Sequence, residues 1–160
     1  MKIVETYLNI IHFCLYKVDY FLHLLYNKVN LVHLVHKLPF QKRRYEKLGI
    51  DPIKVINQFY ENKHYGTSTI FAGGMLLGGI AIFFFSLFII LNLPISLPVI
   101  VVCFALSGIV SYYFVFRNDK YLIYFEQFEK WQKVDKRKYY LLTFSSTIFI
   151  FSLLYLGFIT

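Results

Sequence analysis

The sequence predicts an all-α integral membrane protein with three transmembrane helices. Residues 70–91 and 99–116 contain no charged side chain, and residues 139–159 form a third uncharged run. Each run is close to the length of about 20 apolar residues that a helix needs to cross a bilayer. In addition, 58% of the chain is hydrophobic, more than an ordinary soluble domain contains. The first two runs are separated only by the short turn at 92–98, so they are expected to form a transmembrane hairpin.

Residues 3–37 are predicted to form a long helix with one narrow polar stripe. At about 100° per residue, its polar side chains fall within about 40° of one line. The wide apolar remainder favours a helix that lies at the membrane surface, apolar face down, or packs on another subunit. Spanning is the alternative, although Lys17 and Asp19 would each cost about 2.5–3.5 kcal/mol at the bilayer centre. The polar stripe consists of Glu5, Asn9, His12, Asp19, His23, Asn27 and Asn30, and Lys37 continues it.

A basic patch follows this helix. Pro39 is expected to end the helix at Leu38, because the residue before a proline is forced out of the α region. The cations beyond it are predicted to contact anionic lipid headgroups, at about 1 kcal/mol for each near the surface. The alternative is a solvated face that serves as a topology signal. The basic patch consists of Lys42, Arg43, Arg44 and Lys47.

A short helix is predicted to begin at Pro52. Asp51 suits the N-cap and Pro52 suits the first helical position. Gly66 is then expected to bend the chain into the first span. The apolar face of the short helix consists of Ile53, Val55, Ile56, Phe59 and Tyr60.

Small residues recur on one face of each of the first two spans. Such faces let two helices approach closely, which is how helices associate in lipid. They predict packing of the two spans on each other or, as the alternative, association between chains as a homo-oligomer. The helix-packing residues are Gly74, Gly78 and Ala81 in the first span, and Ala105, Gly108 and Ser111 in the second.

Residues 118–138 hold most of the remaining charge. Asn118 or Asp119 is expected to cap a helix that runs over 120–134 with an aromatic face. The chain is therefore divided into an amphipathic and basic N-terminal region, 1–66, and a membrane domain, 67–160, that includes this helix.

The distribution of positive charge predicts the orientation of the chain. Ten Lys and Arg lie in residues 1–66 and seven in 117–138, whereas the turn at 92–98 and the C-terminus carry none. Because positive loops stay in the cytoplasm, we expect the N-terminus and the 118–138 helix on the cytoplasmic side. The C-terminus is expected on the opposite side.

Four residues are weak candidates for a metal site: Asp19, His23, His33 and His36. The spacing of Asp19 and His23 on one helix face suits a metal pair or a carboxylate–imidazole hydrogen bond. The alternative is that these side chains solvate the helix at headgroup level. No catalytic motif is present, so no catalytic residue and no cofactor is predicted.

These features predict a small multi-pass membrane protein that acts as a scaffold or accessory subunit through its amphipathic helices. Its expected partners are anionic lipid and either a second copy or another membrane protein, but not nucleic acid. One alternative is an oligomeric pore or a membrane-permeabilising effector that uses the polar stripe. A weaker alternative is a small membrane enzyme with a His/Asp site on the N-terminal helix.

Overall fold

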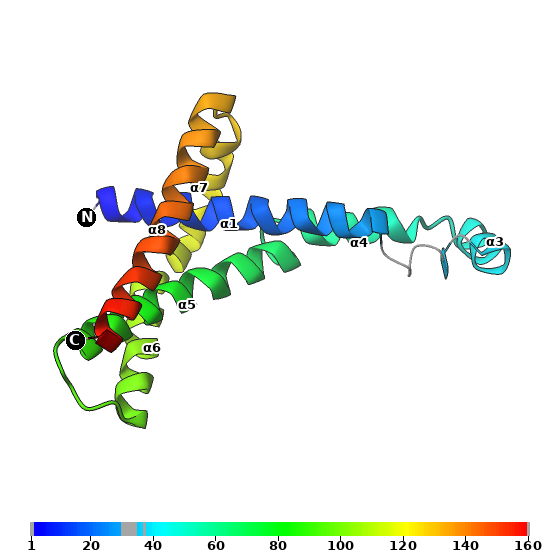
Figure 1. The fold of residues 1–160 in the computed structure, drawn as a ribbon. Coiled ribbons are helices and arrows are strands. Elements are labelled where there is room, and N and C mark those ends of the chain that lie inside the picture. The colour runs from blue at the N-terminus through cyan, green and yellow to red at the C-terminus, as the bar shows by residue number, and fades with distance from the viewer. Residues whose placement is uncertain (1, 30–34, 37, 160) are drawn as a thin grey trace. The chain divides into compact units, whose positions relative to one another are not determined.

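A computed structural model describes residues 2–29, 35–36 and 38–159 of the 160-residue chain. The described residues form helices and connecting turns without a strand, which confirms the all-α prediction for them (Figure 1). The chain divides into two compact units: unit 1 comprises Met1–Leu15 and Ala72–Thr160, and unit 2 comprises Tyr16–Phe71. This division follows contacts within the chain, whereas the predicted boundary at 66/67 follows composition and charge and stays a prediction.

Three helices in the described part of the chain are long and apolar enough to cross a membrane, as predicted. The first is α5 (Thr67–Ile90), which begins directly after Gly66. The second begins with α6 (Leu97–Ser111), which has a proline in its first turn. The third is α8 (Lys133–Ile159). These properties are compatible with an integral membrane protein.

The second apolar helix changes its winding near its end. After α6 the chain forms a π-helix, η1 (Tyr112–Phe116), and then a short turn, η2 (Arg117–Asp119). The predicted helical run over 99–116 is thus helical throughout, and its last five residues are wound as a π-helix. Asn118 and Asp119 have φ angles of 56° and 52°, the left-handed conformation that short polar side chains tolerate. Asp119 precedes α7 (Lys120–Glu129) but makes no capping hydrogen bond, so it turns the chain instead of capping the helix.

The predicted helix over 120–134 is shorter than expected. It ends at Glu129, and α8 starts at Lys133. Trp131, in the turn, stacks on Phe128 with ring centroids 4.1 Å apart and on Tyr139 at the same distance. These aromatic contacts hold the turn between α7 and α8, which periodicity within a single helix does not reveal.

The hairpin of α5 and α6 packs along a face that only partly matches the predicted one. The buried side chains of α6 are Cys103, Ser107 and Ser111, spaced four apart. Ser107 donates a hydrogen bond to the Leu77 carbonyl of α5. This hydroxyl group needs a partner in an apolar setting and so turns toward the neighbouring helix. Ala105 is exposed instead.

Several of the predicted small residues leave open space within the chain. A Cβ atom built on Gly74, Gly78 or Gly108 would meet nothing within 4 Å, whereas Ala81 is buried. The proposed role of these glycines in association between chains stays a prediction.

The N-terminal helix agrees with expectation as far as it is described, whereas the basic segment differs from it. The described part of the N-terminal helix is α1 (Lys2–Val29), and residues 30–34 and 37, with Asn30 and His33, lie outside the described residues. Pro39 starts a helix, α3 (Pro39–Leu48), that was not predicted. It ends at Gly49 with a φ of 62°, which favours glycine.

The predicted cap of the short helix α4 (Pro52–Glu61) is confirmed. Asp51 Oδ1 accepts hydrogen bonds from the backbone N–H groups of Ile53, at 3.0 Å, and Lys54, at 3.2 Å.

Candidate functional site

In unit 1 the polar stripe of α1 faces the protein interior. Asn9 and His12 have no exposed surface. The Asn9 side-chain amide donates to the Glu5 carbonyl at 2.8 Å and to the Phe114 carbonyl of η1 at 3.0 Å. A π-helix shifts the backbone hydrogen-bond register, which makes a carbonyl group such as that of Phe114 accessible to a side chain. These stripe residues therefore bind the protein and do not face headgroups.

His12 lies among aromatic rings of η1 and α7. Its ring centroid is 5.4 Å from that of Phe116, 5.5 Å from Tyr121 and 5.1 Å from Phe125. A Cβ atom on Gly73 of α5 would lie 3.1 Å from the Phe116 ring and 3.9 Å from His12 Nε2. The absence of a side chain at Gly73 thus lets α5 approach this cluster closely.

An ion pair joins the start of α1 to α7. The Lys120 ammonium donates to one Glu5 carboxylate oxygen at 2.9 Å, and the Tyr124 hydroxyl donates to the other at 3.2 Å. Both charged side chains are mostly buried, with exposed fractions of 29% for Lys120 and 22% for Glu5. The hydrogen bond from Lys120 is the main reason that the pKa of Glu5 lies below its ordinary value.

The opposite side of α1 contacts α8. Tyr7 and Ser146 share a hydrogen bond, and the Cys14 thiol lies beside Thr143. Burial raises the pKa of Cys14, so this thiol stays protonated and is a packing residue. Figure 1 shows the blue N-terminal part of α1 crossing α7 and α8.

Besides its contacts with α7, α1 contacts corresponding ends of the three apolar helices in unit 1. Gly73 is near the start of α5, Phe114 and Phe116 are near the end of the second apolar helix, and Thr143 and Ser146 are in the first half of α8. The polar stripe holds α1 to the end of the second apolar helix, and the opposite side of α1 holds it to α8.

In unit 2 the stripe pairs with α4. The Asn27 amide donates to Asn57 Oδ1 at 2.7 Å, and His23 Nε2 lies 3.1 Å from Asn57 Oδ1 and 2.8 Å from Asn27 Nδ2. The His23 ring also stacks on Tyr60, with centroids 3.5 Å apart. The Tyr16 hydroxyl donates to the carbonyl of Glu61 at 2.7 Å. These contacts hold α4 against the second half of α1.

The same helix pair leaves several of its apolar side chains exposed. Val55 and Phe59 of α4 have exposed fractions of 52% and 51%, and Phe21 and Tyr26 of α1 have 59% and 68%. A soluble helix pair normally buries such residues and exposes its amides. In unit 2 this order is reversed, because the amides are in contact and these apolar side chains are exposed. Such exposed apolar side chains indicate an apolar environment around this part of unit 2.

The three metal candidates that the structure describes, Asp19, His23 and His36, form no metal-binding group. Within the described ranges, no group of three or more His, Cys, Asp or Glu side chains could hold a metal ion. His23 is bound to the amides of α4, and His36 Nδ1 lies 3.0 Å from the Tyr45 hydroxyl. Asp19 is half-buried, and its Oδ2 atom has no hydrogen-bond partner among the described residues. His33 lies outside those residues.

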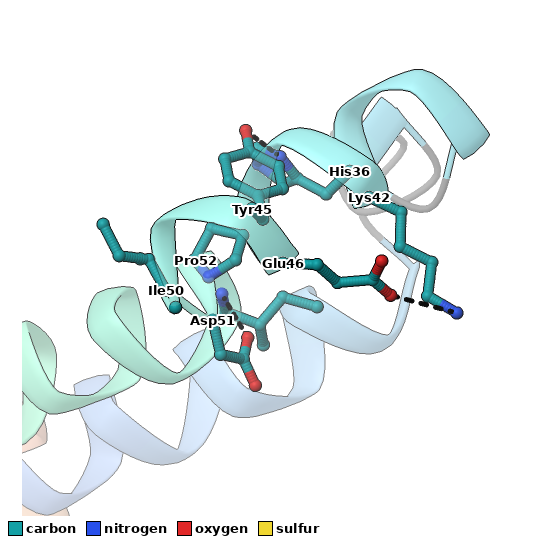
Figure 2. Close-up of a pocket in the computed structure, with 9 residues that line it drawn as sticks. His36, Lys42, Tyr45, Glu46, Ile50, Asp51 and Pro52 are labelled. Carbon is teal, nitrogen blue, oxygen red and sulfur yellow. Dashed lines mark hydrogen bonds and ion pairs between the residues drawn. The ribbon is translucent and has the colours of Figure 1, made fainter.

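A pocket of about 650 Å³ lies where α3 meets α4 (Figure 2). Figure 2 shows two pairs at its rim: His36 with Tyr45, and Lys42 with Glu46 across 3.8 Å. The Asp51 carboxylate at its edge is already engaged as the α4 cap. The pocket is lined by His36, Lys42, Tyr45, Glu46, Gly49, Ile50, Asp51, Pro52 and Ile53.

Sequence reasoning missed three parts of this arrangement: the π-helix, the helical form of the basic patch, and the inward direction of the polar stripe. The two asparagines at positions 9 and 27 were an available signal, because an amide in an otherwise apolar helix needs a protein partner when water is excluded. Comparison with protein families, with curated proteins and with solved structures gives no significant match. The function is therefore argued from geometry alone.

Proposed function

We propose that the chain is an integral membrane protein in which α5, the helix from α6 through η1, and α8 span the bilayer. The N-terminal half of α1 then lies across their cytoplasmic ends. The exposure of the apolar helices supports this proposal. Only 22%, 22% and 11% of their most apolar stretches are buried within the chain. So much exposed apolar surface needs lipid or other membrane helices around it.

The location proposed for α1 follows from its contacts. Spanning would place Lys17 and Asp19 in lipid, whereas Asn9 is bonded to η1 and Glu5 is paired with Lys120, where the second span ends. A helix held at those ends matches a surface position. With the one-sided distribution of Lys and Arg, this supports a cytoplasmic N-terminus and a C-terminus on the opposite side.

Within the membrane, the chain acts as a scaffold or accessory subunit. The observation that carries this proposal is the reversed order of unit 2, with polar contacts between α1 and α4 and apolar residues outside. The ten-residue helix α4 is too short to span the bilayer, so its exposed apolar face is not explained by lipid around a transmembrane helix. We attribute this face to contact with a protein partner. A helix of another membrane protein or of a second copy would cover it.

Site-specific photocrosslinking in the native membrane tests this function. A crosslinker at Phe59, which is exposed on the apolar face of α4, is expected to give a discrete protein adduct. The matched control is Gln58, its exposed polar neighbour, which is expected to give much less. If Phe59 crosslinks only to lipid and the solubilised chain is a monodisperse monomer, the scaffold function is wrong.

The structural observations count against the pore alternative. A pore lined by the polar stripe would need Asn9 and His12 to face water, yet both are fully buried within unit 1. The enzyme alternative gains no support, because His23 Nε2 contacts the side-chain amides of Asn57 and Asn27.

A further inference from the structure

We infer that α3 carries a binding surface for anionic phospholipid headgroups, formed by Arg43, Arg44 and Lys47 around Phe40. This inference rests on the proposed membrane location. It also narrows the basic patch from four cations to three, because the structure separates Lys42 from the others.

The three cations share one face of α3. At about 100° per residue, Arg43, Lys47 and Arg44 fall within an arc of about 100°. Phe40 lies inside this arc and is 76% exposed, and Leu48 borders it at 59% exposed. The three cations are exposed as well. The result is an aromatic side chain surrounded by positive charge.

Lys42 belongs to another part of the helix. It lies about 100° before Arg43 around the helix axis, pairs with Glu46 and lines the pocket of Figure 2. Its charge is thus offset locally. Among the described residues, no carboxylate forms an ion pair with Arg43, Arg44 or Lys47. The three cations give this face a charge of +3, which is also the net charge of α3.

The chemistry of this face matches phospholipid. A guanidinium group binds a phosphate through two parallel hydrogen bonds, and a Phe side chain beside basic residues inserts at the boundary of headgroups and acyl chains. Phe40 and Leu48 offer too little apolar area to hold α3 at a membrane, so charge must supply most of the attraction. Contact should therefore require anionic lipid and weaken as salt screens the charges. The connection 49–66 to α5 keeps α3 tethered to the proposed membrane.

Nucleic acid presents the same phosphate group to the cations. Lipid is favoured because the aromatic ring at the centre of the face is accompanied in unit 2 by the exposed apolar residues of α4. A soluble polyanion offers no apolar phase to these residues.

Fluorescence quenching by brominated lipid tests the inference on the full chain. Phe40→Trp is reconstituted in vesicles of phosphatidylcholine that contain either brominated phosphatidylglycerol or brominated phosphatidylcholine at equal content. The parent chain, with Trp131 as its single tryptophan, provides the background. We expect stronger quenching of Trp at position 40 by the anionic lipid, and a smaller difference at high salt.

A triple variant should abolish this preference: Arg43→Gln/Arg44→Gln/Lys47→Gln. The apparent affinity of α3 for the anionic membrane surface should fall on the order of fivefold for each cation removed. Lys42→Gln is the matched control and should preserve the preference. The inference is overturned if the two brominated lipids quench Trp at position 40 equally, or if neither quenches it. It is also overturned if the triple variant keeps the preference, or if added RNA removes the quenching more effectively than added anionic vesicles do.

Alkaline extraction of the same vesicles separates this inference from the proposed function. A chain that is extracted yet prefers anionic lipid would overturn the three spans and retain the lipid surface. A chain that resists extraction but shows no preference would do the reverse.

Discussion

At the scale of single residues, a few polar side chains decide how the N-terminal helix is held. Asn9 joins two segments of the chain through one amide group, and Glu5 joins α1 to α7 through an ion pair. Asn9 is fully buried, so its hydrogen bonds contribute more than the same amide would at an exposed surface, whereas the Glu5 pair is partly screened by water.

Replacing Asn9 with Leu is expected to destabilise the protein by about 1–3 kcal/mol. The change removes the donor to the Phe114 carbonyl and leaves that carbonyl group buried without its partner. Denaturant unfolding of the protein in micelles measures the loss. Gln127→Leu, at an exposed position of α7, is the control and should change stability little. Equal effects of the two changes would contradict the assigned role of Asn9.

The Glu5–Lys120 pair predicts an acid-dependent step in stability. The pKa of Glu5 is lowered from an ordinary value of 4.5 by the Lys120 hydrogen bond. A carboxyl group whose pKa is lowered by folding stabilises the protein at any pH above its ordinary pKa. This stabilisation is lost as the pH falls through the pKa of the folded state. Melting temperature measured against pH should therefore fall below about pH 4.5 in the wild type.

Glu5→Gln is expected to be less stable than the wild type near neutral pH and to lose part of that acid step. Glu126→Gln, at an exposed position of α7, is the control and should leave the step unchanged. An identical pH profile for Glu5→Gln and the wild type would contradict the role of the pair.

At the scale of helices, sequence patterns succeeded where one kind of force dominates. Three uncharged runs predicted three apolar helices, and the Asp51-Pro52 start of α4 followed from capping chemistry alone. The break after Glu129 did not, because it depends on Trp131 stacking with residues on both sides of the turn. The buried face of α6 was predicted only in part: Ser111 belongs to it, whereas Cys103 and Ser107 replace Ala105 and Gly108, because the Ser107 hydroxyl bonds to α5.

Two adjacent glycines of α5 should respond differently to the same substitution. Gly73→Ala brings a Cβ atom within 3.1 Å of the Phe116 ring, so overpacking should cost about 1–3 kcal/mol. Gly74→Ala meets open space and should not destabilise the single chain. Because both changes add the same helix propensity, the difference in unfolding free energy isolates packing.

The same pair tests the predicted association between chains. If Gly74 packs on a second copy, Gly74→Ala should lower energy transfer between labelled chains in a bilayer while leaving unfolding unchanged. Unchanged energy transfer would remove this residue from the association face.

At the scale of the whole molecule, the direction of the polar stripe is the largest departure from expectation. Periodicity correctly grouped Glu5, Asn9 and His12 on one face of α1, but it could not tell whether that face meets water or protein. The answer depends on a carbonyl group of η1 and on Lys120, both more than 100 residues away in sequence. Long-range partners of this kind carry no local signal.

The proposed topology predicts the fate of reporters fused to the chain. A reporter at the C-terminus is expected on the side opposite the cytoplasm, whereas one at the N-terminus is expected in the cytoplasm. Protease protection of intact cells or vesicles distinguishes the two sides. A cytoplasmic C-terminal reporter would contradict the three-span arrangement and point to α1 as a fourth span.

The stacked turn between α7 and α8 has a practical consequence. Trp131 is the only tryptophan in the chain, and it lies against Phe128 on one helix and Tyr139 on the other. Its near-ultraviolet circular dichroism and fluorescence emission therefore report, without a label, whether α7 and α8 remain in contact at this turn. Any event that parts them, whether partner docking, acidification or a change of lipid, would register in a single optical signal from the unmodified protein.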